Sequence, residues 1–153
     1  MVPLLSLDPE PNRPDLPLDD GVRILGRILA VDPGDARIGL AVSDPTGLLA
    51  RPLMVIEHSS REEDARRIAL VAESQEASAI VIGLPLDQEG NVGPQARKSL
   101  RLVEALREET KLPVKTWDES GTTMQALETH GQDELLDARA AAYLLQDYLD
   151  AQT

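Results

Sequence analysis

The chain has 153 residues and a formal net charge of −12, with 42% hydrophobic and only 2% aromatic residues. This length suits one domain, whose core must be built from Leu, Ile, Val and Ala because Phe is absent. The absence of cysteine excludes disulfides and thiolate metal sites, and the negative charge argues against broad, non-specific attraction to nucleic acid. Since there are only two histidines, a metal site would be built from oxygen ligands, which favours Mg²⁺ or Mn²⁺ over Zn²⁺.

Residues 1–22 are expected to form a flexible extension, and the domain is expected to span residues 23–153. Five prolines alternate with acids in the extension, a composition typical of chain that does not join a core. No basic, apolar leader follows Met1, and no apolar run approaches the roughly 20 residues that a membrane helix needs. We therefore expect a soluble, cytoplasmic protein without membrane contact.

The start of the domain is predicted to form two strands joined by a tight turn. Residues 28–31 are a continuous apolar run, typical of a strand buried on both faces, and residues 38–42 restore an apolar run after Pro33-Gly34-Asp35. Asp32 therefore lies where a buried strand ends. It is either a turn aspartate that bonds to its own loop or a metal ligand or catalytic carboxylate.

Strands and helices then alternate along the chain. Residues 50–57 indicate a third strand, in which Pro52 predicts an edge position or a bulge. The later elements are expected to be a helix that begins at Ser59-Ser60, a strand over 78–82, a helix from Pro94, a strand over 112–117, a short helix over 122–129 and a last helix over about 133–150. A three-strand antiparallel meander followed by βαβαβ predicts an α/β domain with a mixed five-stranded sheet flanked by helices, and the crossover rule puts the later strands beside the first.

Three acids lie at the ends of these predicted elements. Asp32 ends the first strand, Glu119 follows the fifth, and Asp137 lies on the last helix. Two like charges about 4 Å apart repel by roughly 4 kcal/mol at an effective dielectric constant near 20, so three converging carboxylates would need a cation. Two divalent ions about 3.5–4 Å apart would also hold the attacking and leaving oxygens of a phosphodiester displacement. The spacing leaves open the alternative of solvated acids on loop and helix ends.

Four basic residues are candidates for contacts with the phosphates of nucleic acid. They are Arg37 in the first hairpin and Arg97, Lys98 and Arg101 on the helix that begins at Pro94. A solvated helix face is the alternative for the last three, because surface charges contribute little. Trp117 is either a platform for a stacked base or a packing residue, and packing is the more common role of a single aromatic at a strand end.

Several short motifs occur in a characteristic order. They are Ile28-Leu-Ala-Val-Asp32-Pro-Gly34 with Arg37-Ile-Gly39 and Ala41-Val-Ser-Asp44, Ile82-Gly-Leu-Pro85-Leu86 with Gly93-Pro-Gln95, Trp117-Asp-Glu119 with Thr122-Thr123, and Asp137 before the alanines and Leu144-Leu-Gln146. Together they resemble the YqgF family, also called RuvX, over about residues 26–150. The resemblance implies an RNase H-like fold and a nuclease that uses Mg²⁺ or Mn²⁺ on the pre-16S rRNA 5′ end or on branched DNA. It also implies that Asp32, Glu119 and Asp137 are the catalytic, metal-binding acids.

The segment before the last helix departs from this family. In the family, the Asp-Glu pair is usually followed by an arginine and an apolar residue, whereas Ser120-Gly121 follow it in this chain. The family is also rich in Lys and Arg just before the last acid, whereas residues 128–136 of this chain contain neither. From Trp117 to Asp150, eight acids stand against one base, Arg139. Because fewer phosphate contacts weaken binding to nucleic acid, the alternative is a catalytically weakened binding module that acts through a protein partner.

A nucleotide phosphotransfer protein is a third hypothesis. The Asp-x-Gly hairpin also resembles the first phosphate-binding motif of actin-like ATPases and sugar kinases, but those folds need a second lobe, for which 153 residues leave no room. The sequence leaves open RNA against DNA, endo- against exonuclease action, and a monomer against a homodimer.

Overall fold

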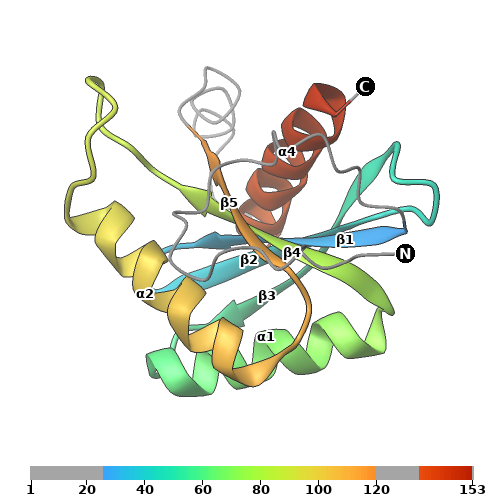
Figure 1. Cartoon of the computed structure of the whole chain (residues 1–153), viewed down its shortest axis with the longest axis horizontal. Coiled ribbons are helices and arrows are strands. Elements are labelled where there is room, and N and C mark those ends of the chain that lie inside the picture. The colour runs from blue at the N-terminus through green and yellow to red at the C-terminus, as the bar shows by residue number, and fades with distance from the viewer. Residues whose placement is uncertain (1–25, 120–134, 153) are drawn as a thin grey trace, which may run out of the picture.

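The computed structural model describes residues 26–119 and 135–152 and contains a five-stranded sheet with helices on both faces (Figure 1). The strands are β1 (Arg27–Pro33), β2 (Arg37–Ser43), β3 (Ala50–Glu57), β4 (Ala77–Leu84) and β5 (Val114–Asp118), and the helices are α1 (Arg61–Ser74), α2 (Pro94–Glu109) and α4 (Leu136–Ala151). The expected extension over residues 1–22 and the expected helix over 122–129 lie outside the described residues. None of the described helices is long and apolar enough to cross a bilayer.

The strand order in the sheet is β3-β2-β1-β4-β5. The first three strands pair antiparallel, and β4 pairs parallel with both β1 and β5, which confirms the predicted mixed sheet and the position of the later strands. The two expectations for Pro52 are also confirmed. Its strand lies at the sheet edge, and the register shifts there, with Leu40 opposite Met54 but Ala41 opposite Pro52.

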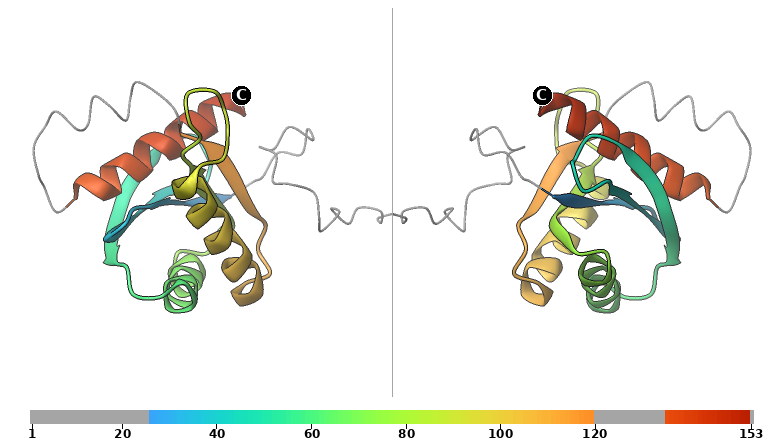
Figure 2. Two further views of the ribbon diagram at one scale, coloured as in Figure 1. Left: turned by 90° about the vertical axis from the view of Figure 1, so that its left-hand side faces the viewer. Right: turned by 90° about the vertical axis from the view of Figure 1, so that its right-hand side faces the viewer.

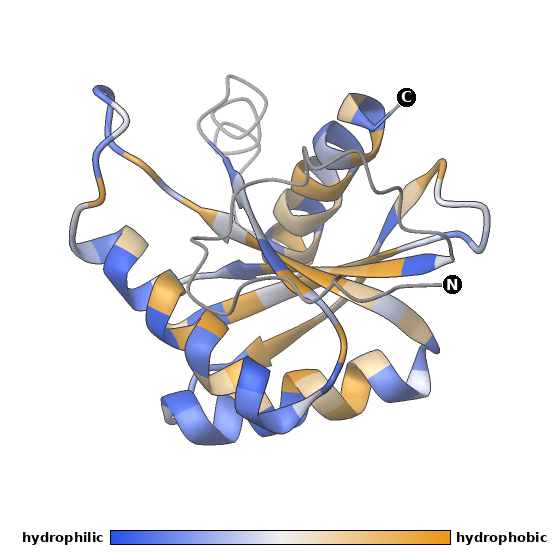
Figure 3. Cartoon of the chain, viewed as in Figure 1, coloured by the Kyte–Doolittle hydropathy of each residue, from blue (hydrophilic) through white to orange (hydrophobic). Residues whose placement is uncertain are grey.

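Helices α1 and α2 cover one face of the sheet, and α4 covers the other (Figure 2). Alternate residues of β1 therefore enter two different clusters: Leu29 and Val31 pack under α1 and α2, whereas Ile28 and Ala30 pack under α4. All four are buried, as the continuous apolar run predicted. Apolar residues concentrate along the strands, and polar ones lie on the outer faces of the helices (Figure 3).

The ends of the elements follow local hydrogen bonding. Helix α1 begins after Ser60, whose side chain accepts a hydrogen bond from the Glu63 backbone N–H, and α2 begins at Pro94, both as predicted. Strand β5 begins at Val114 rather than at residue 112. The reason is that the Leu112 N–H donates to the Thr110 side chain and residue 113 is a proline without an N–H.

Candidate active site

Asp32 extends the row of β1 side chains that faces α4. It lies two residues beyond Ala30, near the end of β1, and so on the same face of the sheet as Ile28 and Ala30. Burial is the largest cause that raises the pKa of Asp32 to about 6. A carboxylate in this position is therefore costly to ionise unless a positive charge is brought to it.

Glu119 shares a hydrogen bond with Asp32. Glu119 directly follows β5. Its backbone N–H donates to the Leu84 carbonyl at 3.3 Å, which continues the pairing of β5 with β4. Burial raises the pKa of Glu119 to about 9, with the charge of Asp32 as the second cause. Because β1 and β5 both neighbour β4, their ends are adjacent, and the two acids meet across the end of β4.

Asp137 lies in the first turn of α4 and approaches Asp32 from above the sheet. Its charge is one of the causes that raise the pKa of Asp32. Its own carboxylate accepts a hydrogen bond from Nε of Arg37 at 2.8 Å, so the arginine of the first hairpin already neutralises it. The three predicted acids thus lie around one strand end, with Asp137 held by a protein cation.

Two glycines on the strands beside β1 make this convergence sterically feasible. Gly39 is the register partner of Asp32, and a Cβ there would lie 1.9 Å from the carbonyl oxygen of Asp137. A Cβ at Gly83 on β4 would lie 1.9 Å from Oε2 of Glu119. The missing side chains therefore leave the space that α4 and the Glu119 carboxylate occupy. Sequence reasoning included both glycines in its motifs but gave them no role, although glycine inside a buried strand is itself a signal of a close approach.

The donor atoms suit a hard divalent cation. Oε2 of Glu119 is buried and has no hydrogen-bond partner in the part of the chain that the structure describes, an arrangement that a cation would satisfy. In residues 26–119 and 135–152, no three potential ligands are already arranged around a common metal position. The Asp32–Glu119 pair fits a cation as it stands, whereas Asp137 would have to exchange Arg37 for it.

The four predicted nucleic-acid contacts do not form one patch. Arg37 lies beside the acids, Lys98 pairs with Asp35 in the first hairpin at 3.2 Å, and Arg101 lines a pocket on the α1–α2 side. Arg97 is exposed on α2 and does not line that pocket. Trp117 packs edge-to-face on Tyr148, with ring centroids 5.2 Å apart, which agrees with the packing interpretation.

Comparison with known proteins gives a consistent result. Residues 26–151 match the family model described as RuvX, Holliday junction resolvase. Proteins named "Putative pre-16S rRNA nuclease" from Thermoanaerobacter pseudethanolicus and Desulforamulus reducens are each 38% identical to the chain and align with 82% of it and 97% of their own length. Among solved structures, T. thermophilus RuvC in complex with a Holliday junction substrate has a TM-score of 0.51 at 20% identity, covering 82% of this chain and 95% of that one. The chain therefore belongs to the RuvX (YqgF) family and has the RNase H-like fold of the RuvC-type resolvases.

Proposed function

We propose that the protein is a divalent-metal-dependent nuclease that hydrolyses phosphodiester bonds, with Asp32, Glu119 and Asp137 as its catalytic and metal-binding acids. The observation that supports this most directly is the buried Asp32–Glu119 pair. Both pKa values are raised by burial, and one Glu119 oxygen has no hydrogen-bond partner among the described residues. Without a cation the two carboxyls share a proton, and a bound cation would replace that proton and neutralise both carboxylates.

Each of the three acids would bind the metal from a different secondary-structure element. Asp32 is carried by the central strand of the sheet, Glu119 by the end of β5 and Asp137 by α4, so the donor set is held by the packed core. When bound, Mg²⁺ or Mn²⁺ would supply the positive charge that lowers the barrier to attack on phosphorus. Arg37, released from Asp137 by the metal, would be free to contact a phosphate of the substrate.

The names of the relatives favour RNA as the substrate. The curated relatives are named for pre-16S rRNA, whereas two solved structures of similar fold, T. thermophilus RuvC and the Fowlpox virus resolvase, are complexes with Holliday junction DNA. We infer an endonuclease that processes the pre-16S rRNA 5′ end in the cytoplasm, with branched DNA as the competing substrate.

Cleavage of labelled structured RNA and of a four-way DNA junction, each with Mn²⁺ or Mg²⁺ at low salt, tests this function. Asp32→Asn keeps the shape of the side chain and removes its charge, so it should abolish cleavage. Asp147→Asn, which changes an exposed acid on α4, is the matched control and should cleave like the parent. Full cleavage by Asp32→Asn would remove Asp32 from the mechanism, and the better-cleaved polymer identifies the substrate class.

The alternative is a weakened binding module that acts through a protein partner, and one observation favours it. Asp137 is already neutralised by Arg37, which lowers its need for a cation. Calorimetric titration with Mn²⁺ separates the two functions, because a nuclease needs saturable ion binding that Asp32→Asn removes. A binding module would show neither saturable binding nor cleavage.

A further inference from the structure

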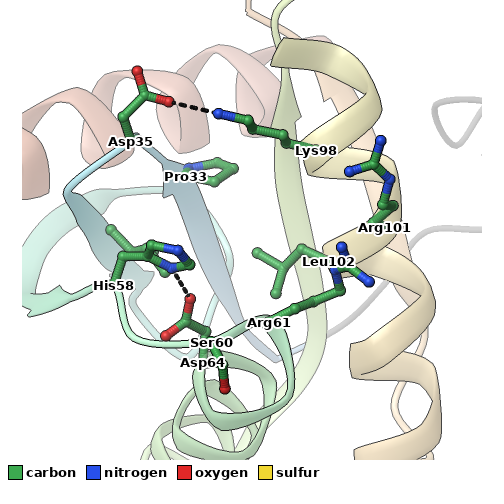
Figure 4. Close-up of a pocket in the computed structure, with 11 residues that line it drawn as sticks. Pro33, Asp35, His58, Ser60, Arg61, Asp64, Lys98, Arg101 and Leu102 are labelled. Atoms are coloured by element: carbon green, nitrogen blue, oxygen red, sulfur yellow. Dashed lines mark hydrogen bonds and ion pairs between the residues drawn. The ribbon is translucent and has the colours of Figure 1, made fainter. Parts of the chain in front are cut away.

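A pocket of about 260 Å³ lies at the tip of the β1–β2 hairpin, on the sheet face that α1 and α2 cover (Figure 4). Its floor is apolar and is formed by Pro33, Ile38 and Leu102. Asp32 and Pro33 are consecutive residues of β1 and face opposite sides of the sheet. The pocket is therefore separate from the acids described above, although both sites share the same hairpin.

Three cationic side chains surround this floor. Arg61 comes from the start of α1, and Lys98 and Arg101 come from α2. Neither Arg61 nor Arg101 has an acidic or hydrogen-bonding partner among the residues that the structure describes. The acids in the first turn of α1 offset the partial positive charge of the helix N-terminus. The positive charge at the pocket therefore comes from the arginine and lysine side chains. Two arginines that converge without partners in the described part of the chain, beside a lysine in an exposed ion pair, indicate a site for an anion.

His58 adds a polar group whose orientation is held from behind. Its Nδ1 pairs with Asp64, a carboxylate with only 3% side-chain exposure that also accepts hydrogen bonds from the Ser59 N–H at 3.0 Å and from Nη2 of Arg67 at 2.9 Å. A buried acid with three donors holds the imidazole rigidly. The other ring nitrogen, Nε2, has no partner among the described residues, and because Nδ1 donates to Asp64, Nε2 of the neutral imidazole can accept a hydrogen bond from a hydroxyl of a ligand in the pocket.

Asp35 is the acid that competes with a ligand. Its carboxylate accepts from Lys98 at 3.2 Å and from Gln95 at 3.4 Å, so that the ion pair bridges the hairpin and α2 above Pro33 (Figure 4). Both partners are well exposed, 63% for Lys98 and 65% for Asp35, and exposed pairs exchange their partners at little cost. An entering anion would take Lys98 from Asp35.

We propose that this pocket binds the phosphate of a nucleotide, with the sugar or base over the apolar floor. Three cationic side chains suit a doubly charged phosphate, and the apolar floor below them suits a flat or sugar-like group rather than a bare inorganic ion. The volume is near the lower end of small-molecule pockets, at roughly 300 Å³, so it limits the occupant to a single nucleotide. The nucleotide is either free or part of a strand, and only the second source rests on the proposed nuclease function.

Calorimetric titration of the full chain in EDTA, without cleavage, tests the proposal with AMP, adenosine and inorganic phosphate as probes. AMP should bind, whereas adenosine and inorganic phosphate should bind at least about tenfold more weakly, as expected for the loss of charged or apolar contacts. Arg61→Gln and Arg101→Gln should each weaken AMP about tenfold. Arg51→Gln, an exposed arginine on β3, should leave the affinity unchanged.

Asp35→Asn gives a test that damage to the fold cannot imitate. Removing the competing carboxylate should strengthen AMP binding several-fold, because Lys98 is then free. No AMP binding, equal weakening by Arg51→Gln, or weaker binding by Asp35→Asn would each overturn the proposal. These results do not depend on cleavage, so they fail independently of the nuclease function.

A short 5′-phosphorylated oligonucleotide, compared with AMP on the same variants, identifies the source of the phosphate. Tighter binding of the oligonucleotide that Arg61→Gln weakens assigns the pocket to a strand. Equal or weaker binding assigns it to a free mononucleotide, and binding of the oligonucleotide that ignores both arginine variants overturns the pocket as its site.

Discussion

The two faces of the sheet carry opposite charge at the same hairpin. On the α4 face, Asp32 and Glu119 are held close together by packing that leaves no room for a Cβ on the neighbouring strands. On the α1–α2 face, the charges of Lys98 and Arg101 belong to side chains on a helix surface. The comparison shows that one site depends on the backbone positions of the fold and the other on side chains. Single substitutions should therefore cause large losses of stability or activity at the acidic site and smaller losses of binding at the basic pocket.

Gly39→Ala is expected to have the largest effect on the acidic face. Its Cβ would lie 1.9 Å from the Asp137 carbonyl, a backbone atom, so α4 must move away from the sheet. Overpacking of this kind costs about 1–3 kcal/mol and sometimes more, and a backbone obstacle puts the loss at the upper end of that range. Urea unfolding measures it. Gly93→Ala, where a Cβ meets nothing within 4 Å, is the control, and because Gly93 is the N-cap residue of α2 it should lose no more than about 1 kcal/mol.

Gly83→Ala sharpens the same test because its obstacle is a side chain. The Cβ would meet Oε2 of Glu119, which can turn away, and Leu144 at 3.1 Å. We expect a smaller loss of stability than for Gly39→Ala, together with loss of any cleavage because Glu119 is displaced from Asp32. Equal losses of stability in the two variants would contradict the distinction between a fixed and a movable obstacle.

The features that the sequence predicts are those that depend on neighbouring residues, and the features that it misses depend on contacts between residues far apart in the chain. The run 28–31 predicts a doubly buried strand because its periodicity is local, and Asp32 and Glu119 were placed at strand ends for the same reason. The Gly39–Asp137 approach joins residues far apart in the chain, so no local pattern reports it. The family motifs identified the acids, but the space that admits them became visible only in the structure.

The basic pocket was out of reach for a similar reason. Lys98 and Arg101 were expected on α2, but the pocket also needs Arg61, the first residue of α1, and His58, which precedes that helix. Only the packing of α1 beside α2 brings them together. The apolar pattern of a helix predicts which of its faces is buried, but it does not predict which other helix packs against that face.

The metal-free pH dependence of stability is the next smaller effect and again belongs to the acidic face. Asp32 and Glu119 have pKa values raised to about 6 and about 9, so the folded state favours their protonated forms. Their contribution to stability is complete below about pH 4, where both states are protonated, and it is lost progressively as the pH rises from about 4 through the folded pKa values of about 6 and about 9. Thermal melts in EDTA should show a falling Tm over this window. Asp32→Asn should flatten the fall, and an unchanged profile in that variant would contradict the assignment.

Arg97→Gln is expected to have the smallest effect and separates the pocket from the rest of α2. Arg97 was predicted as a phosphate contact together with Arg101, one helical turn away, but it is exposed and does not line the pocket. A solvated surface charge contributes about 0–1 kcal/mol, so RNA binding at moderate salt should change by less than about fivefold and AMP binding should not change. Filter binding of the two variants side by side measures this. If Arg97→Gln weakens RNA as much as Arg101→Gln does, the whole outer face of α2 holds the nucleic acid, and the charges on this side act as a surface rather than as a pocket.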